Sequence, residues 1–192
     1  MRLIIADQYD DMSRVAAGLV REQLARKPAS LLVFPTGATP LGLFRQLVDE
    51  ARSGRIDASA LRVAVLDEYA GLPKGDRRSL TDWLRRELLL PLGIPDDRLV
   101  AFDPAGDAEA EGPRIEAAIR AAGGLDLAIL GLGPNGHIGF NEPGSPFSCR
   151  SRLATLSPAS IRSNAAYWGS EADVPRTGFT LGLGTLLGAR RM

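Results

Sequence analysis

The chain has 192 residues, 45% hydrophobic and 24% charged, which is typical of one globular domain and excludes a disordered chain. Its 23 basic and 23 acidic residues give zero net charge, which argues against a general nucleic-acid footprint. The single cysteine, Cys149, excludes an intramolecular disulfide, and the single histidine, His137, argues against a His/Cys metal cluster.

The elements predicted along the chain alternate between short apolar runs and longer amphipathic ones. The apolar runs predict strands at 3–6, 31–34, 63–66, 99–102, 125–132, 153–156 and 179–183. Helical periodicity predicts helices at 10–26, from 41 to near 54, at 79–90, 108–122 and 157–167, with Ser79 as an N-cap. This alternation predicts an α/β domain with a mainly parallel sheet and helices on both faces. Because the first residues lack a signal-peptide core and no run of 18 apolar residues occurs, we expect a cytoplasmic protein without membrane contact.

Ligands bind at the carboxyl ends of strands in such sheets, and three motifs follow predicted strands directly. The first is FPTGATPL, residues 34–41, a turn of small residues before a helix. Its backbone N–H groups and the helix dipole suit a phosphate, and Thr36 and Thr39 add hydroxyl groups. The pattern is neither a P-loop nor GxGxxG, so nucleotide binding is not supported. The alternative interpretation is an ordinary tight turn with Thr39 as the helix cap.

The second motif is Asp67-Glu68-Tyr69, at the end of an apolar strand. Partial burial and a neighbouring like charge raise the pKa of a carboxyl group, so one of these acids could serve as a general base. Side chains alternate along an extended segment, so only one of the two should face the ligand crevice. The alternative is a pair of solvated loop acids.

The third motif is the glycine-rich loop GLGPNGHIGFNEP, residues 131–143. Its glycines allow sharp turns and a close approach to a ligand. Glu142 lies five residues after His137, where a turn could bring its carboxylate to one imidazole nitrogen and leave the other as a proton acceptor. The alternative is a structural histidine in a loop.

Together, the strings PTGATPLG, LDEYAGLP and GLGPNGHIGFNEP resemble the glucosamine-6-phosphate deaminase family over nearly the whole chain. The resemblance implies a modified Rossmann-like α/β fold. It also implies aldose–ketose isomerisation with deamination of glucosamine 6-phosphate to fructose 6-phosphate and ammonia, in amino-sugar breakdown. No cofactor or metal is expected, and the expected partner is the small-molecule substrate, with a homo-oligomer as one option.

The family's functional residues match positions of this sequence. Asp67 matches the proton acceptor for enolisation, and His137 matches the base that opens the pyranose ring, with Glu142 as its carboxylate partner. Asn135 matches a further member of the ring-opening set. The phosphate-binding loop corresponds to Thr36, Gly37, Ala38 and Thr39.

Some positions depart from the family pattern. An arginine that the family often carries in an NSRFF-like segment is absent from residues 163–168, and only Arg152 matches a cation of the allosteric site seen in some members. We also expect the single domain, residues 1–192, to lack the C-terminal strand and helices with which family members continue, and hence to bind substrate weakly. The alternatives are a 6-phosphogluconolactonase-type hydrolase on the same fold and a non-catalytic sugar-phosphate sensor.

Overall fold

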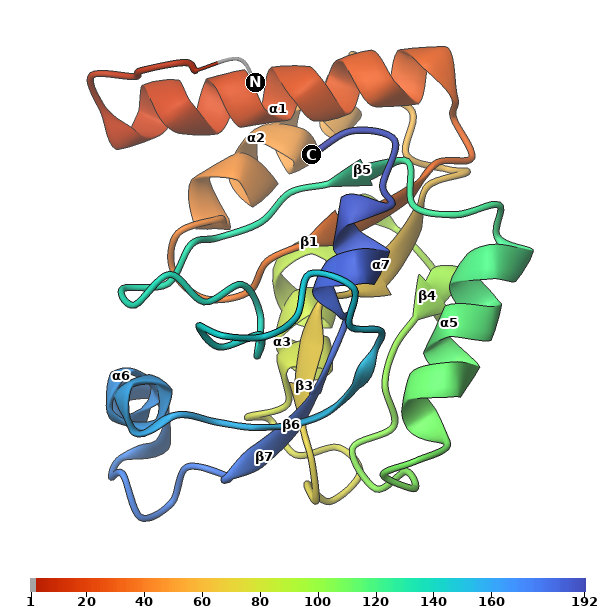
Figure 1. Cartoon of the computed structure of the whole chain (residues 1–192). Helices are drawn as coiled ribbons and strands as arrows, with labels where there is room; N and C mark the ends of the chain where they lie inside the picture. The colour runs from red at the N-terminus through yellow and green to blue at the C-terminus, as the bar shows by residue number, and fades with distance from the viewer. Residues whose placement is uncertain (1–2) are drawn as a thin grey trace.

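The main sheet is parallel, as the sequence predicts. The computed structural model of the protein describes residues 3–192. Four parallel strands follow the order β4-β2-β1-β5 (Figure 1). Their bounds are β1 (Leu31–Phe34), β2 (Arg62–Val65), β4 (Leu99–Val100) and β5 (Leu127–Ala128). The fully buried β1 is a central strand, which explains why all four of its side chains are apolar.

Helices cover both faces of this sheet. One face is covered by α1 (Tyr9–Arg26), α2 (Leu41–Arg52) and the continuous helical segment α3 (Leu80–Leu84), η1 (Arg85–Leu89) and α4 (Leu90–Leu92). The other is covered by α5 (Glu111–Ala121) and α7 (Leu183–Leu187). Alternation along β1 sends Leu32 and Phe34 into the first core and Leu31 and Val33 into the second. No helix among residues 3–192 is long and apolar enough to cross a membrane.

A second, antiparallel sheet, which the sequence pattern does not predict as a separate sheet, lies below the first in Figure 1. It has the order β3-β7-β6, from β3 (Asp67–Tyr69), β7 (Thr177–Thr180) and β6 (Arg152–Thr155). The helix α6 (Pro158–Trp168) connects β6 to β7. Since β3 begins two residues after β2 ends, the chain leaves the parallel sheet and joins the second sheet at Asp67.

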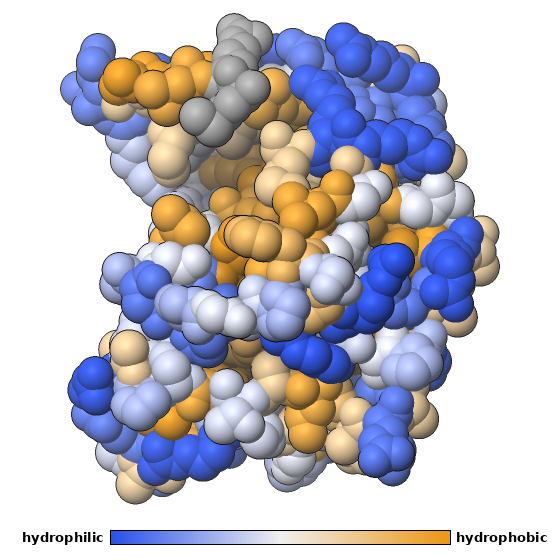
Figure 2. Space-filling model, in the orientation of Figure 1, coloured by the Kyte–Doolittle hydropathy of each residue, from blue (hydrophilic) through white to orange (hydrophobic). Residues whose placement is uncertain are grey.

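Several predicted elements differ from the structure. The strand predicted at 179–183 is shifted to β7 (Thr177–Thr180), and Leu183 begins α7. The strand predicted at 99–102 is regular only at Leu99–Val100. The strand predicted at 3–6 is wrong, because no strand forms there, and Leu3 and Ile5 are 78% and 82% exposed. The strand predicted at 125–132 is regular only at Leu127–Ala128, and its glycine-rich end is a loop. The helix predicted at 108–122 begins at Glu111. Besides the exposed Leu3 and Ile5, hydrophobic side chains also reach the surface in the middle of the face that carries β5 and α7 (Figure 2).

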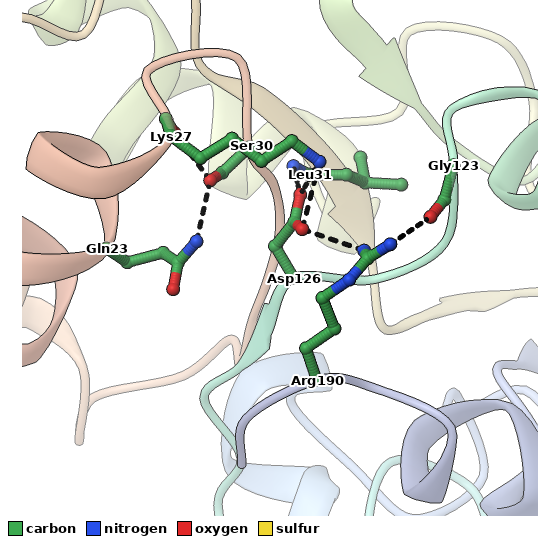
Figure 3. Close-up of polar contacts among 7 residues, drawn as sticks. All are labelled: Gln23, Lys27, Ser30, Leu31, Gly123, Asp126 and Arg190. Atoms are coloured by element: carbon green, nitrogen blue, oxygen red, sulfur yellow. Dashed lines mark hydrogen bonds and ion pairs between the residues drawn. The ribbon is translucent and has the colours of Figure 1, made fainter.

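A buried carboxylate at the amino ends of β1 and β5 links α1 to the C-terminal segment (Figure 3). Asp126 is 1% exposed and accepts hydrogen bonds from Lys27 at 2.8 Å, from Arg190 at 2.8 Å and from the backbone N–H of Leu31 at 2.9 Å. Burial raises its pKa, but these hydrogen bonds and charges prevail and hold the pKa below its usual value. The ionised carboxylate therefore ties α1, β1 and the C-terminal segment together.

Candidate active site

A cavity of about 600 Å³ opens at the carboxyl ends of β1 and β2 and beside the loop that follows β5. Each of the three motifs predicted from the sequence contributes to its wall. The lining residues from these motifs include Thr36, Gly37, Ala38, Thr39, Asp67, Gly133 and His137. The remaining wall comes from α6 and from the loop that leads into α3. The prediction that ligands face the strand ends thus agrees with the position of the cavity.

The loop at residues 36–39 presents backbone donors to the cavity. Gly37 has φ +93°, a left-handed conformation that favours glycine, and the Tyr167 hydroxyl lies against it. Within residues 3–192, the backbone N–H groups of Gly37, Ala38 and Thr39 have no hydrogen-bond acceptor. The alternative role of Thr39 as helix cap is not observed, because α2 has no side-chain cap. The loop therefore offers the donors and the helix N-terminus that an anion requires.

Tyr9 of α1 fixes the end of this loop, a contact that sequence reasoning missed. Its hydroxyl donates to the carbonyl oxygen of Thr39 at 2.9 Å and accepts from the N–H of Gly42 at 2.7 Å. A Cβ atom at Gly42 would collide with Ser13 and Tyr9, so glycine permits this close approach of α1 to α2. The predicted helix begins at residue 10, whereas α1 begins at Tyr9, so the sequence pattern gives no signal for this contact.

Asp67 and Glu68 divide their roles as the alternation of the strand predicts. Asp67 lines the cavity and is 7% exposed, and its Oδ1 has no hydrogen-bond partner within the described chain. Burial raises its pKa to about 7, and the neighbouring Glu68 carboxylate adds to the effect. Asp67 is therefore positioned to accept and return a proton near neutral pH.

Glu68 points away from the cavity and is fully buried. Its carboxylate accepts from the N–H of Leu80 at 3.0 Å, from the N–H of Thr81 at 2.9 Å and from the hydroxyl of Ser79 at 2.6 Å. Ser79 is also the N-cap of α3, as predicted. Glu68 thus binds the start of α3 to β3, which is a structural role.

The glycine-rich loop brings His137 to the cavity. A Cβ atom at Gly133 would overlap the imidazole ring, so only glycine allows the loop to close over His137. The N–H of Gly133 donates to the carbonyl oxygen of His137 at 2.9 Å, which closes the turn. Farther on, the buried Asn141 donates to the carbonyl oxygen of Leu181 at 2.8 Å and fastens the loop beside β7.

Asn135 stands between His137 and Glu142, which corrects the direct hydrogen bond expected from their spacing. Asn135 Oδ1 lies 2.6 Å from His137 Nδ1, and Asn135 Nδ2 donates to Glu142 Oε2 at 3.0 Å. The turn at Gly136 (φ +90°) folds Asn135 back over the ring, so the amide occupies the place expected for the carboxylate. His137 and Glu142 therefore interact through one side chain.

The N-terminus of α6 completes this arrangement. Glu142 Oε1 accepts from the N–H of Ser157 at 3.0 Å, and Ser160 Oγ lies 3.3 Å from His137 Nδ1. Burial raises the pKa of Glu142, but the hydrogen bonds from Ser160, Ser157 and Asn135 outweigh it and keep the pKa below its ordinary value. Sequence reasoning missed Ser157 and Ser160, although their position at the start of a predicted helix is a capping signal.

The other positions noted in the sequence lie outside this arrangement. Arg152 of β6 donates to Asn141 Oδ1 at 2.8 Å and does not line the cavity. Around Ala166, the cavity-facing residues of α6 are Ser163, Asn164, Tyr167 and Trp168, none of which has a basic side chain. The described residues contain no group of three or more His, Cys, Asp or Glu that could hold a metal ion.

Comparisons with known proteins show the family to which the chain is related. The family model described as glucosamine-6-phosphate isomerases/6-phosphogluconolactonase matches residues 6–190. A glucosamine-6-phosphate deaminase of Halothermothrix orenii is 40% identical over the whole chain, which spans 80% of that relative. A glucosamine-6-phosphate deaminase of Bacillus subtilis is 37% identical over 97% of the chain and 76% of its own length.

Solved structures agree with this relationship. A glucosamine-6-phosphate deaminase described as monomeric superposes with a TM-score of 0.94 at 33% identity, covering 98% of this chain and 79% of its own. A 6-phosphogluconolactonase of Plasmodium vivax shares the fold, with a TM-score of 0.74 at 17% identity over 97% of this chain and 73% of its own. The chain belongs to the glucosamine-6-phosphate isomerase/6-phosphogluconolactonase family.

Proposed function

We propose that the protein is a glucosamine-6-phosphate deaminase, which converts glucosamine 6-phosphate and water to fructose 6-phosphate and ammonia. The observation that carries this proposal is the buried Asp67, which shares one cavity with His137 and an anion-binding loop. Relatives that are 37–40% identical bear this activity in their names. The proposed phosphate-binding residues are Thr36, Gly37, Ala38 and Thr39.

In the proposed first step, His137 opens the pyranose ring by moving the proton of the anomeric hydroxyl to the ring oxygen. The ionised Glu142 accepts from Asn135 Nδ2, which turns Asn135 Oδ1 toward the imidazole. Oδ1 then accepts the proton on Nδ1, so that Nε2 carries the free lone pair. The Asn135–Glu142 pair thus selects the tautomer in which Nε2 acts as the base.

In the second step, Asp67 takes the proton from C2 of the open-chain sugar, which the C1 carbonyl makes acidic, and returns a proton to C1. The enolic intermediate becomes an imine at C2, and water converts this imine to the ketone and ammonia. A base with a pKa of about 7 is well matched to proton transfer at neutral pH. This chemistry uses only the chain's own acids and bases, and each contributes roughly 10²–10⁴-fold in rate.

Ammonia release from glucosamine 6-phosphate tests the proposal, with hydrolysis of 6-phosphogluconolactone as the competing assay. We expect the first activity and not the second. Asp67→Asn should abolish ammonia release and the exchange of the C2 proton with deuterated water, because the near-isosteric amide removes only the base. Glu109→Gln, an exposed acid away from the cavity, is the matched control and should retain both. Normal C2 exchange in Asp67→Asn would show that another residue is the base.

We further propose a cytoplasmic location. The substrate is a phosphate dianion, which does not cross a membrane unaided, so the enzyme should reside where sugar phosphates are made. Immunodetection in cell fractions tests this, and recovery in the membrane or secreted fraction would contradict it.

A further inference from the structure

The arginine side chains that line the cavity come from one side of it. Besides His137, the only basic side chains that line it among residues 3–192 are those of Arg77 and Arg78, in the loop between β3 and α3. A phosphate dianion bound at residues 36–39 would otherwise rest on backbone donors and a helix dipole, which is a modest contribution at an exposed site. The loop at Arg77 and Arg78 is therefore where further positive charge can reach the substrate.

The guanidinium of Arg78 already forms an ion pair with Asp76. Its Nε and Nη2 donate to the two carboxylate oxygens of Asp76 at 3.0 and 2.7 Å, and its guanidinium lies 4.5 Å from the ring centre of Trp168. This hydrogen bonding lowers the pKa of Asp76 to about 2, so the pair remains ionised and its charges offset each other. The stacking on Trp168 also ties the loop to α6.

Arg77 differs, because its guanidinium forms no ion pair or hydrogen bond within residues 3–192. Its backbone is fixed, since its carbonyl oxygen accepts from Arg86 Nη2 at 3.2 Å and the N–H of Ser79 closes a turn onto Asp76 at 3.0 Å. The loop thus holds an uncompensated cation at the cavity wall, on a backbone that its neighbours hold in place.

We propose that Arg77 contacts the phosphate group of the bound sugar phosphate and completes the anion site begun by residues 36–39. This inference rests on the proposed function for the identity of the substrate, but the chemistry that it names is that of a phosphate dianion. Arginine suits this role because its guanidinium remains charged and donates two parallel hydrogen bonds to phosphate oxygens. Arg78 acts as a positioning residue, which sets the loop that presents Arg77.

Calorimetric titration with inorganic phosphate tests the proposal without turnover. Arg77→Gln should weaken phosphate binding roughly tenfold or more, as expected for the loss of a charge-assisted hydrogen bond. Arg77→Lys should recover part of the affinity. Arg120→Gln, which removes an exposed arginine of α5 outside the cavity, should bind like the unmodified protein.

Steady-state kinetics add a second readout. In Arg77→Gln, KM for glucosamine 6-phosphate should rise by a similar factor while kcat changes less than threefold, because the ring-opening and enolisation groups are intact. Phosphate affinity within twofold of the unmodified protein, or a loss confined to kcat, would overturn the proposal. If the unmodified protein releases no ammonia, the proposed function fails, and the phosphate titrations still decide the role of Arg77.

Discussion

Replacing Asp67 with asparagine should stabilise the fold, and the gain should grow with pH. Folding moves the pKa of this carboxyl from its ordinary value of 3.8 to about 7. Between these values the folded state binds more protons than the unfolded state, so raising the pH lowers stability, and the loss is complete above the folded pKa. The cost of burying Asp67 is then about 1.7 kcal/mol at pH 5 and about 4.3 kcal/mol at pH 8. Asparagine carries no such cost.

Urea denaturation of both proteins at pH 5 and pH 8 measures this effect. The difference in the free energy of unfolding between Asp67→Asn and the unmodified protein should increase by about 2.5 kcal/mol between the two pH values. In thermal unfolding, the difference in Tm should increase by about 5–10 °C. Comparing the two pH values cancels any constant effect of the amide on packing. Glu109→Gln serves as the control for loss of one carboxylate. A difference that stays constant with pH would refute the assignment of Asp67 as a buried acid with a raised pKa.

Two further predictions test contacts at the site, and a third tests the buried Asp126 network. Asn135→Ala should lower kcat about 100-fold. Adding Glu142→Gln should lower kcat less than threefold further, because Asn135 and Glu142 act on His137 as one unit. If the losses in kcat multiply in the double variant, this coupling is wrong. Tyr9→Phe removes the hydroxyl that fixes the loop at residues 36–39 and should raise KM about fivefold with kcat within twofold. A loss in kcat alone would argue against this role for Tyr9. Asp126→Asn should lower the free energy of unfolding by about 3 kcal/mol in urea titrations, because it leaves two cations without their buried carboxylate; a loss below about 1 kcal/mol would show that the network contributes little.

The parts of the fold that the sequence predicts are those with strong periodicity. The apolar run at 31–34 and the amphipathic run at 10–26 each have one stable way to bury their side chains, and both form as expected. The run at 3–6 has the same composition as a strand, but a strand also needs a pairing partner, and the described residues offer none. The second sheet depends on pairing between distant segments such as 67–69 and 177–180, which local patterns do not encode.

In the candidate site, too, local sequence patterns predict some features, while others depend on how the chain folds. Alternation along a strand predicts that only one of Asp67 and Glu68 faces the cavity, and the family resemblance indicates Asp67, which lines it while Glu68 is structural. Spacing alone could not reveal that Asn135 lies between His137 and Glu142, because the path of the turn depends on the conformation of its glycines.

The second sheet also has a consequence for the order in which the protein assembles. The loop at residues 36–39 is held by contacts between Tyr9 and the start of α2, segments that leave the ribosome early. The reacting end of the site depends on β7, which pairs with β3 at Asp67, and on the adjoining Leu181, which fastens the glycine-rich loop. Contacts across such long separations are slow to form, because loop closure must precede them. A growing chain can therefore form the contacts between Tyr9 and the start of α2 long before Asp67 and His137 come together across the cavity.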